Sequence, residues 1–125
     1  MHVQVFHYAG CSTCKQALTW LRGQGVAFDA VDLVETPPSP AQLAEVLRFS
    51  GAEARKLFNV TGLVYRGEGW AQKAVGLSDA AILTALAANG RLIKRPLLVV
   101  TRTGGKGAAC IGFRAPEWHA ALELP

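Results

Sequence analysis

Two cysteines, Cys11 and Cys14, lie three residues apart near the start of the chain. An apolar run, Val3–Phe6, precedes them, and a helix-like pattern from Lys15 to Arg22 follows. We expect a strand to deliver the pair to the first turn of a helix, where free backbone N–H groups and the helix dipole favour negative charge. Because a cysteine at such a position ionises more readily than a free thiol, the pattern indicates redox or nucleophilic thiol chemistry.

The two cysteines are expected to differ in role. Cys11 is the expected nucleophile, since the first thiol of such a pair is usually the more exposed, and Cys14 is placed to attack a Cys11 adduct or mixed disulfide. The alternatives are two ordinary thiols or a metal site, for which the further ligand candidates are His7 and Cys110. No second Cys-x-x-Cys motif supports a metal. Cys110 lies among apolar residues and is expected to be a buried small hydrophobic side chain.

Length and composition favour one globular domain. Half of the 125 residues are hydrophobic and 18% are charged, which excludes a disordered composition, and three cysteines do not make a disulfide framework. No apolar stretch reaches the roughly 18 residues that span a bilayer, and the N-terminus lacks the basic region of a secretory signal. We therefore expect a cytoplasmic protein with no membrane partner.

The net charge of +4 comes from basic residues that are scattered along the chain. No block of them resembles a nucleic-acid-binding tail, so direct nucleic-acid binding is not expected. Several lie in expected loops, which suits a small anionic substrate or an acidic partner surface. The alternative is an ordinary basic surface without a dedicated ligand.

The first third of the chain carries a β-α-β pattern. Val3–His7 is expected to be a buried strand, Thr13–Gln24 a helix, and Val26–Leu33 a second strand. Such a unit predicts two parallel strands joined by a right-handed crossover.

Helical patterns fill the middle of the chain. Ser39 is expected to cap a helix that has Pro40 at its first position and runs to about Phe49. Further helical segments are expected at 53–58, 70–75 and 79–88. Asn59–Gly62 between them is expected to be a turn, with Gly62 in a left-handed conformation.

The last third predicts two strands and a helix. Leu97–Thr101 and Ala108–Phe113 are expected to form a hairpin around Gly104 and Gly105, and a helix is expected from Ala115 to Leu122.

The order β-α-β, helices, β-β-α predicts an α/β thioredoxin-like fold with a four-stranded mixed sheet. We expect a single domain over residues 1–125, with a helical insert at about 39–90. In this fold a proline, usually cis, precedes the third strand and faces the cysteines, and Pro96 occupies that position. The alternative is a trans proline that only starts a strand.

Four motifs spread over the whole chain resemble the arsenate reductase–Spx family, whose members carry a helical insert inside a thioredoxin-like fold. They are His7–Lys15, Arg55–Gly62, Leu92–Leu97 and the pair Gly112-Phe113. The likeness is greatest to the poorly characterised arsenate reductase-like subgroup, on Phe-Asn-x-x-Gly in the middle and Lys-Arg-Pro before the third strand.

The resemblance implies a set of site residues. Cys11 matches the family nucleophile, and Arg95 and Arg114 match two of the three arginines that surround the oxyanion. The third arginine falls on Asn59, which donates hydrogen bonds but brings no charge. Arg55, one helical turn earlier, is a candidate to replace it. Catalysis is expected from Cys11, Cys14 and Arg95, and substrate binding from Arg114, His7, Asn59, Pro96, Ser12 and Thr13.

The resemblance implies a thiol-dependent reductase in which Cys11 attacks an oxyanion or a disulfide. Cys14 or an external thiol resolves the adduct, with no bound cofactor and with glutathione, glutaredoxin or thioredoxin as electron donor. The alternative within the family is an Spx-like redox sensor that binds RNA polymerase without catalysis. The sequence ends at Pro125 without the charged tail of Spx regulators, which favours the reductase. A relative with another substrate is a third option, given Asn59.

Overall fold

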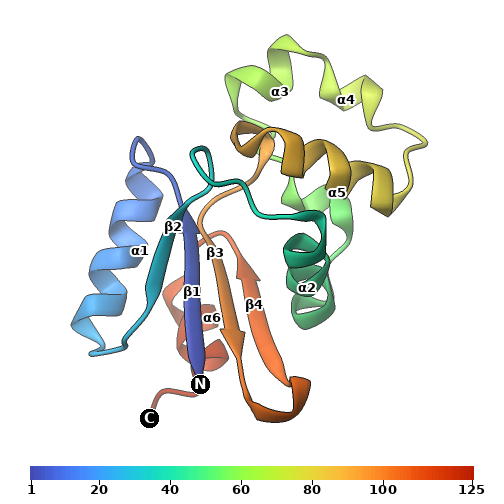
Figure 1. Cartoon of the computed structure of the whole chain (residues 1–125). Helices are drawn as coiled ribbons and strands as arrows, with labels where there is room; N and C mark the ends of the chain where they lie inside the picture. The colour runs from blue at the N-terminus through green and yellow to red at the C-terminus, as the bar shows by residue number, and fades with distance from the viewer.

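Four strands form one mixed sheet in the order β2-β1-β3-β4 in the computed structural model, which describes residues 1–125 (Figure 1). The strands are β1 (His2–His7), β2 (Asp29–Asp32), β3 (Leu97–Thr101) and β4 (Gly107–Ile111). β1 pairs in parallel with β2 and antiparallel with β3, and β3 pairs antiparallel with β4. The chain therefore has the expected thioredoxin-like arrangement of a β-α-β and a β-β-α unit.

One face of the sheet is covered by α1 (Ser12–Gly23) and α6 (Ala115–Ala121). Side chains alternate along a strand, so Val3 and Val5 of β1 point into this layer while Phe6 points to the other face. Trp118 of α6 is fully buried, and its ring meets that of Phe113 edge-on with 5.0 Å between centroids. This tryptophan helps to cover the sheet.

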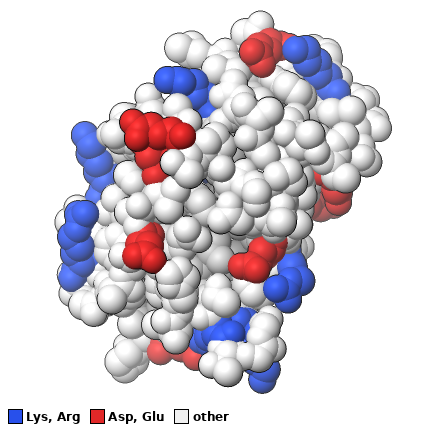
Figure 2. Space-filling model, in the orientation of Figure 1, with Lys and Arg blue, Asp and Glu red and all other residues white.

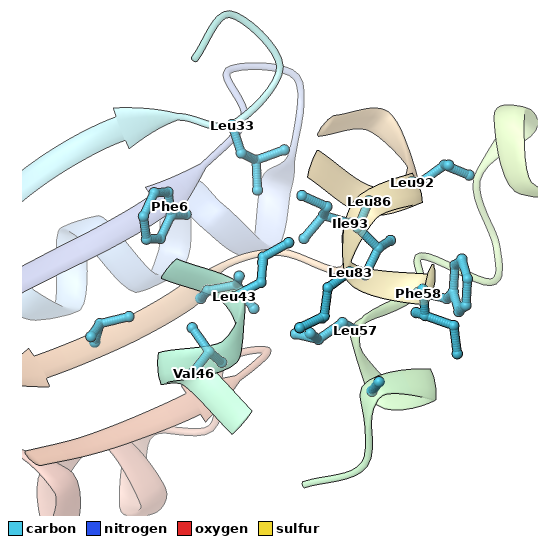
Figure 3. Packing of buried hydrophobic residues seen from close by; sticks show 14 of the residues in the cluster. Phe6, Leu33, Leu43, Val46, Leu57, Phe58, Leu83, Leu86, Leu92 and Ile93 are labelled. Atoms are coloured by element: carbon cyan, nitrogen blue, oxygen red, sulfur yellow. The ribbon is translucent and has the colours of Figure 1, made fainter. Parts of the chain in front are cut away.

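The opposite face carries α2 (Pro40–Ser50), and the other helices that lie between β2 and β3 in the chain pack beside α2 toward one end of the sheet (Figure 1). These are η1 (Ala54–Leu57), α3 (Leu63–Gly67), α4 (Trp70–Lys73), α5 (Asp79–Ala88) and η2 (Gly90–Leu92). Figure 3 shows Phe6 and Leu43 pointing into the same hydrophobic core as Leu57, Leu86 and Ile93. The helical insert and the sheet thus share one core.

Local sequence signals explain how α2 and the hairpin form. The Ser39 hydroxyl accepts the N–H of Gln42, the Gln42 side chain accepts the N–H of Ser39, and Pro40 takes the first turn. Gly51 ends the helix in a left-handed conformation, at φ 72°. At the other end of the fold, the turn η3 (Thr103–Gly105) joins β3 to β4, as expected from Gly104 and Gly105.

Three local predictions were wrong. The expected strand Val26–Leu33 is paired only over Asp29–Asp32, because the Val26 N–H bonds back to the Leu21 carbonyl at the end of α1. Helix α3 was missed, since it is only five residues long and has no fully buried side chain, which leaves no hydrophobic periodicity to detect. Gly62 is not left-handed but extended, with φ −76° and ψ 152°.

Surface charges are interspersed rather than grouped. Figure 2 shows Lys and Arg side chains scattered among Asp and Glu side chains on the face that it presents, with no block of one sign. No helix in the structure has both the length and the apolar character that crossing a membrane requires.

Candidate active site

Cys11 is the N-cap residue of α1. Its backbone is extended, with φ −101° and ψ 114°, and its Sγ accepts the N–H of Cys14 over 3.2 Å. The Cys11 N–H in turn donates to the Tyr8 carbonyl over 3.1 Å, which fixes the loop that leads from β1. The sulfur therefore takes the place of a capping oxygen at the positive end of the helix dipole, where negative charge on it is stabilised.

Cys14 lies behind Cys11 and is 1% exposed. Burial, with a smaller contribution from its hydrogen bond to Cys11, raises the pKa of the Cys14 thiol from 9.0 to about 12. Both cysteines are free thiols. Cys14 is therefore protonated at neutral pH, and of the two thiols only Cys11 is accessible to a ligand.

Cys11 opens onto a cleft of about 840 Å³ at one end of the sheet. Four segments line it: the loop from β1 into α1, the turn before α3, the stretch from η2 to β3, and the residues after β4. The lining contains four basic side chains and no acidic one, and the basic residues are Arg91, Lys94, Arg95 and Arg114. None of them forms an ion pair with a carboxylate. The cleft is consequently a region of positive potential that favours anions.

Arg95 is the most firmly held of these cations. Its Nη1 donates to the carbonyls of Arg91 and Ile93 over 3.3 and 3.4 Å, and its guanidinium lies 5.0 Å from the centroid of the Tyr8 ring. The half-buried side chain thus has its position fixed by backbone acceptors and an aromatic face. Its remaining N–H groups are available to an anion.

The peptide bond between Arg95 and Pro96 is cis, as expected from the sequence. Pro96 is buried and does not line the cleft. Its carbonyl accepts the N–H of Gly112 over 2.8 Å, and the Gly112 carbonyl accepts the indole N–H of Trp118 over 2.9 Å. The segment after β4, which carries Arg114, is therefore tied both to the start of β3 and to the buried face of α6.

The cleft brings together six of the nine expected site residues, namely Cys11, Ser12, Thr13, Asn59, Arg95 and Arg114. Cys14 and Pro96 are buried behind its surface. His7, expected to bind substrate, does not line the cleft: it pairs with Asp32 of β2 in the sheet. Arg55 does not line it either, because its Nη2 donates to the Ala74 carbonyl over 2.9 Å.

Asn59 and Gly62 form a tight turn at the rim of the cleft. The Asn59 N–H donates to the Leu92 carbonyl over 2.7 Å, and the Gly62 N–H donates to the Asn59 carbonyl over 3.0 Å. A Cβ on Gly62 would lie 2.5 Å from Asn59 Nδ2. Glycine is needed here for the close approach of the amide rather than for a positive φ.

Sequence reasoning missed two of the cleft cations, Arg91 and Lys94. They lie just before the cis-proline, and the spacing of three basic residues within five positions ahead of Pro96 was the available signal. Tyr8, whose ring supports Arg95, was also not singled out.

Cys110 lies apart from the cleft, on β4. It is half-buried, and burial raises the pKa of its thiol to about 11. No group of three or more His, Cys, Asp or Glu side chains lies close enough together to hold a metal ion. The chemistry available at the site is therefore that of one accessible thiol beside several cations.

Comparison with known proteins extends over the whole chain. The sequence model of the ArsC family matches residues 6–121. The uncharacterized protein YusI of Bacillus subtilis is 33% identical over 119 residues, 95% of this chain and 97% of its own length. An arsenate reductase of Neisseria meningitidis is 29% identical over 121 residues, 96% of this chain and 97% of its own. A crystal structure from Bacteroides fragilis, described as ArsC family related, superposes with a TM-score of 0.85 at 29% identity, covering 97% of this chain and 98% of that one.

Proposed function

Because the chain belongs to the ArsC family, we propose that it is a thiol-dependent reductase in which Cys11 attacks an anionic substrate. One observation carries the proposal: the only accessible thiol of the pair caps a helix and faces a cleft that has four cations and no carboxylate. Arg95 and Arg114 are the groups that hold the negative oxygens, since guanidinium groups bind such oxygens through paired N–H donors.

With a disulfide as substrate, the Cys11 thiolate attacks one sulfur, forms a mixed disulfide and releases the other sulfur as a thiolate. A second thiol then attacks Cys11 Sγ, and the remaining half of the substrate leaves after taking up a proton. The substrate has gained two electrons, and two thiols have become one disulfide. Reduction of that disulfide by a thiol donor restores the protein.

With arsenate as substrate, Cys11 attacks the As(V) centre and displaces an oxygen as water, which gives a sulfur–arsenic bond. A second thiol attacks Cys11 Sγ, and the electron pair of the sulfur–arsenic bond stays on arsenic, which leaves as As(III). The electron balance is that of the disulfide reaction. Arsenate places negative oxygens beside Cys11, and glutathione disulfide brings carboxylates that the basic lining of the cleft can bind.

The burial of Cys14 favours an external thiol for the second step. Because burial raises the pKa of the Cys14 thiol to about 12, this thiol is much less ionised at neutral pH than a free thiol, and the thiolate is the attacking form. Glutathione, glutaredoxin or thioredoxin is the proposed source of the resolving thiol.

The test is steady-state reduction of arsenate and of glutathione disulfide, with each of the three donors, by four proteins. Cys11→Ser should abolish turnover, and Cys14→Ser should retain most of it. Cys110→Ser is the matched control and should be unchanged, because Cys110 lies outside the cleft. Unchanged turnover in Cys11→Ser would overturn the proposal. If the wild-type protein turns over neither substrate and its oxidised form alone captures RNA polymerase from a lysate, the Spx-like function is favoured instead.

A further inference from the structure

The backbone at Lys94, at the edge of the cleft, is held in place by hydrogen bonds. Its N–H donates to the Leu57 carbonyl over 2.7 Å, and the neighbouring residues Phe58 and Ile93 form an isolated antiparallel bridge. Both bridge residues are buried in the core. The point from which the Lys94 side chain extends is therefore held by the core of the insert.

The end of the Lys94 side chain lies over Gly112. A Cβ on Gly112 would lie 3.3 Å from Lys94 Cε and 3.8 Å from Nζ. Gly112 has φ 84°, and it is fixed by hydrogen bonds on both sides, to the Pro96 carbonyl and from the Trp118 indole. The absence of a side chain at Gly112 leaves the space in which the ammonium group sits, two residues from Arg114 in the chain.

Lys94 lines two neighbouring hollows, and its ammonium group lies in the one that contains Cys11, the cleft described above. The second hollow, of about 560 Å³, shares Asn59, Thr61 and Lys94 with the cleft and contains one carboxylate, Glu53. Lys94 forms no ion pair with Glu53. Gly112 lines the cleft and not the second hollow, so the proximity of Lys94 Nζ to Gly112 places the charge on the cleft side.

We propose that Lys94 is an anion-binding residue of the Cys11 cleft. Lys94 supplies a positive charge on the side of the cleft where Asn59, a neutral residue, also lies. Its ligand is a negatively charged oxygen of the molecule that Cys11 attacks. This inference rests on the proposed function. The ammonium group of a lysine is flexible and has three donors, so it can bind anions of different shapes. The planar guanidinium groups of Arg95 and Arg114 instead favour anions whose oxygens match their paired N–H donors.

The test compares two alkylating reagents that react with the same thiolate. Iodoacetate is an anion and iodoacetamide is neutral, so the ratio of their second-order rate constants at Cys11 reports local charge, while changes in thiolate fraction cancel. The measurements use proteins that carry Cys110→Ser, so that Cys11 is the accessible thiol. Lys94→Met should lower the ratio about fivefold at low ionic strength, and added salt should shrink the effect.

Two further variants make the result specific. Lys94→Arg should restore the ratio to within about twofold of wild type, because it keeps the charge. Lys56→Met removes an exposed lysine that lines only the second hollow, and it should leave the ratio unchanged. An unchanged ratio in Lys94→Met, or an equal fall in Lys56→Met, would overturn the inference. If Arg95→Met lowers the ratio while Lys94→Met does not, the cleft binds anions as proposed, and only the inference that Lys94 contributes to this binding is rejected.

Discussion

Replacing Arg95 with glutamine should weaken anion binding in the cleft by about thirtyfold. Arg95 Nη1 is already shared between two backbone carbonyls, at 3.3 and 3.4 Å, so the other N–H groups are the ones available to a ligand. Hydrogen bonds to charged groups contribute about 1.5–3 kcal/mol in proteins. Taking about 2 kcal/mol for this half-exposed group gives a factor of about thirty in the dissociation constant.

The same substitution should have only a modest effect on stability. The two backbone hydrogen bonds that it removes are long, at 3.3 and 3.4 Å, and the contact that Arg95 makes with a side chain is the stacking on Tyr8, at 5.0 Å from the ring centroid. Such contacts contribute about 0.5–1 kcal/mol at exposed sites. Loss of anion binding in a protein that remains folded therefore separates the ligand role of Arg95 from a structural one.

The assay is protection of Cys11 from iodoacetamide by inorganic phosphate, which binds without being reduced. The phosphate concentration that halves the alkylation rate gives the dissociation constant. Arg66→Gln is the matched control, since Arg66 is an exposed arginine of α3 that does not line the cleft. The reasoning is refuted if phosphate does not protect the wild-type protein, or if Arg95→Gln and Arg66→Gln have equal half-protection concentrations.

Three further predictions concern titration and packing. In a variant whose only cysteine is Cys14, thiolate absorbance should appear above pH 9.0, because burial raises the pKa of this thiol even without the hydrogen bond to Cys11. Because the pKa is raised in the folded protein, the stabilisation by this thiol is complete below pH 9.0 and is lost as the pH rises through the folded-state pKa. Asp32 accepts two backbone N–H groups, at 2.8 and 3.0 Å, and these hydrogen bonds lower its pKa. The stabilisation by this carboxylate is therefore present above pH 3.8 and is lost as the pH falls. Asp32→Ala should lower the free energy of unfolding, measured with urea at pH 7, by about 1 kcal/mol, and should make that free energy depend less on pH in the acid range. Gly90→Ala would drive a Cβ into the Leu33 carbonyl and should cost at least about 3 kcal/mol, whereas Gly67→Ala, with open space around it, should be neutral or slightly stabilising.

Much of the fold could be predicted because its signals are local. Apolar alternation, the Ser39–Pro40 start and the glycines at helix ends and in the hairpin mark the elements, and their order restricts the topology. The short extent of β2 could not be predicted, since it depends on the hydrogen bond that the Val26 N–H donates to the Leu21 carbonyl at the end of α1. Helix α3 left no clear pattern, because it is short and only Val64 and Tyr65 pack partly against the core.

A site residue could be predicted where the same short segment contains the reactive side chain and the element that positions it, as with Cys11 at the start of α1. For Lys94 the sequence offered only the cluster of basic residues ahead of Pro96. Its place in the cleft also depends on a bridge to the segment around Phe58 and on the missing side chain of Gly112, which lie far apart in the sequence. His7 was expected near the substrate because of the family resemblance. Alternation along β1 puts it on the same face as Val3 and Val5, under α1 and α6.

The most direct test of the central claim is the site of the covalent adduct. Cys14→Ser protein is mixed with glutathione disulfide in the absence of any reducing thiol, and the adduct is located by peptide mass spectrometry. The account predicts one glutathione per chain, on the peptide that contains Cys11. An adduct on Cys110, or no adduct on Cys11, would contradict it.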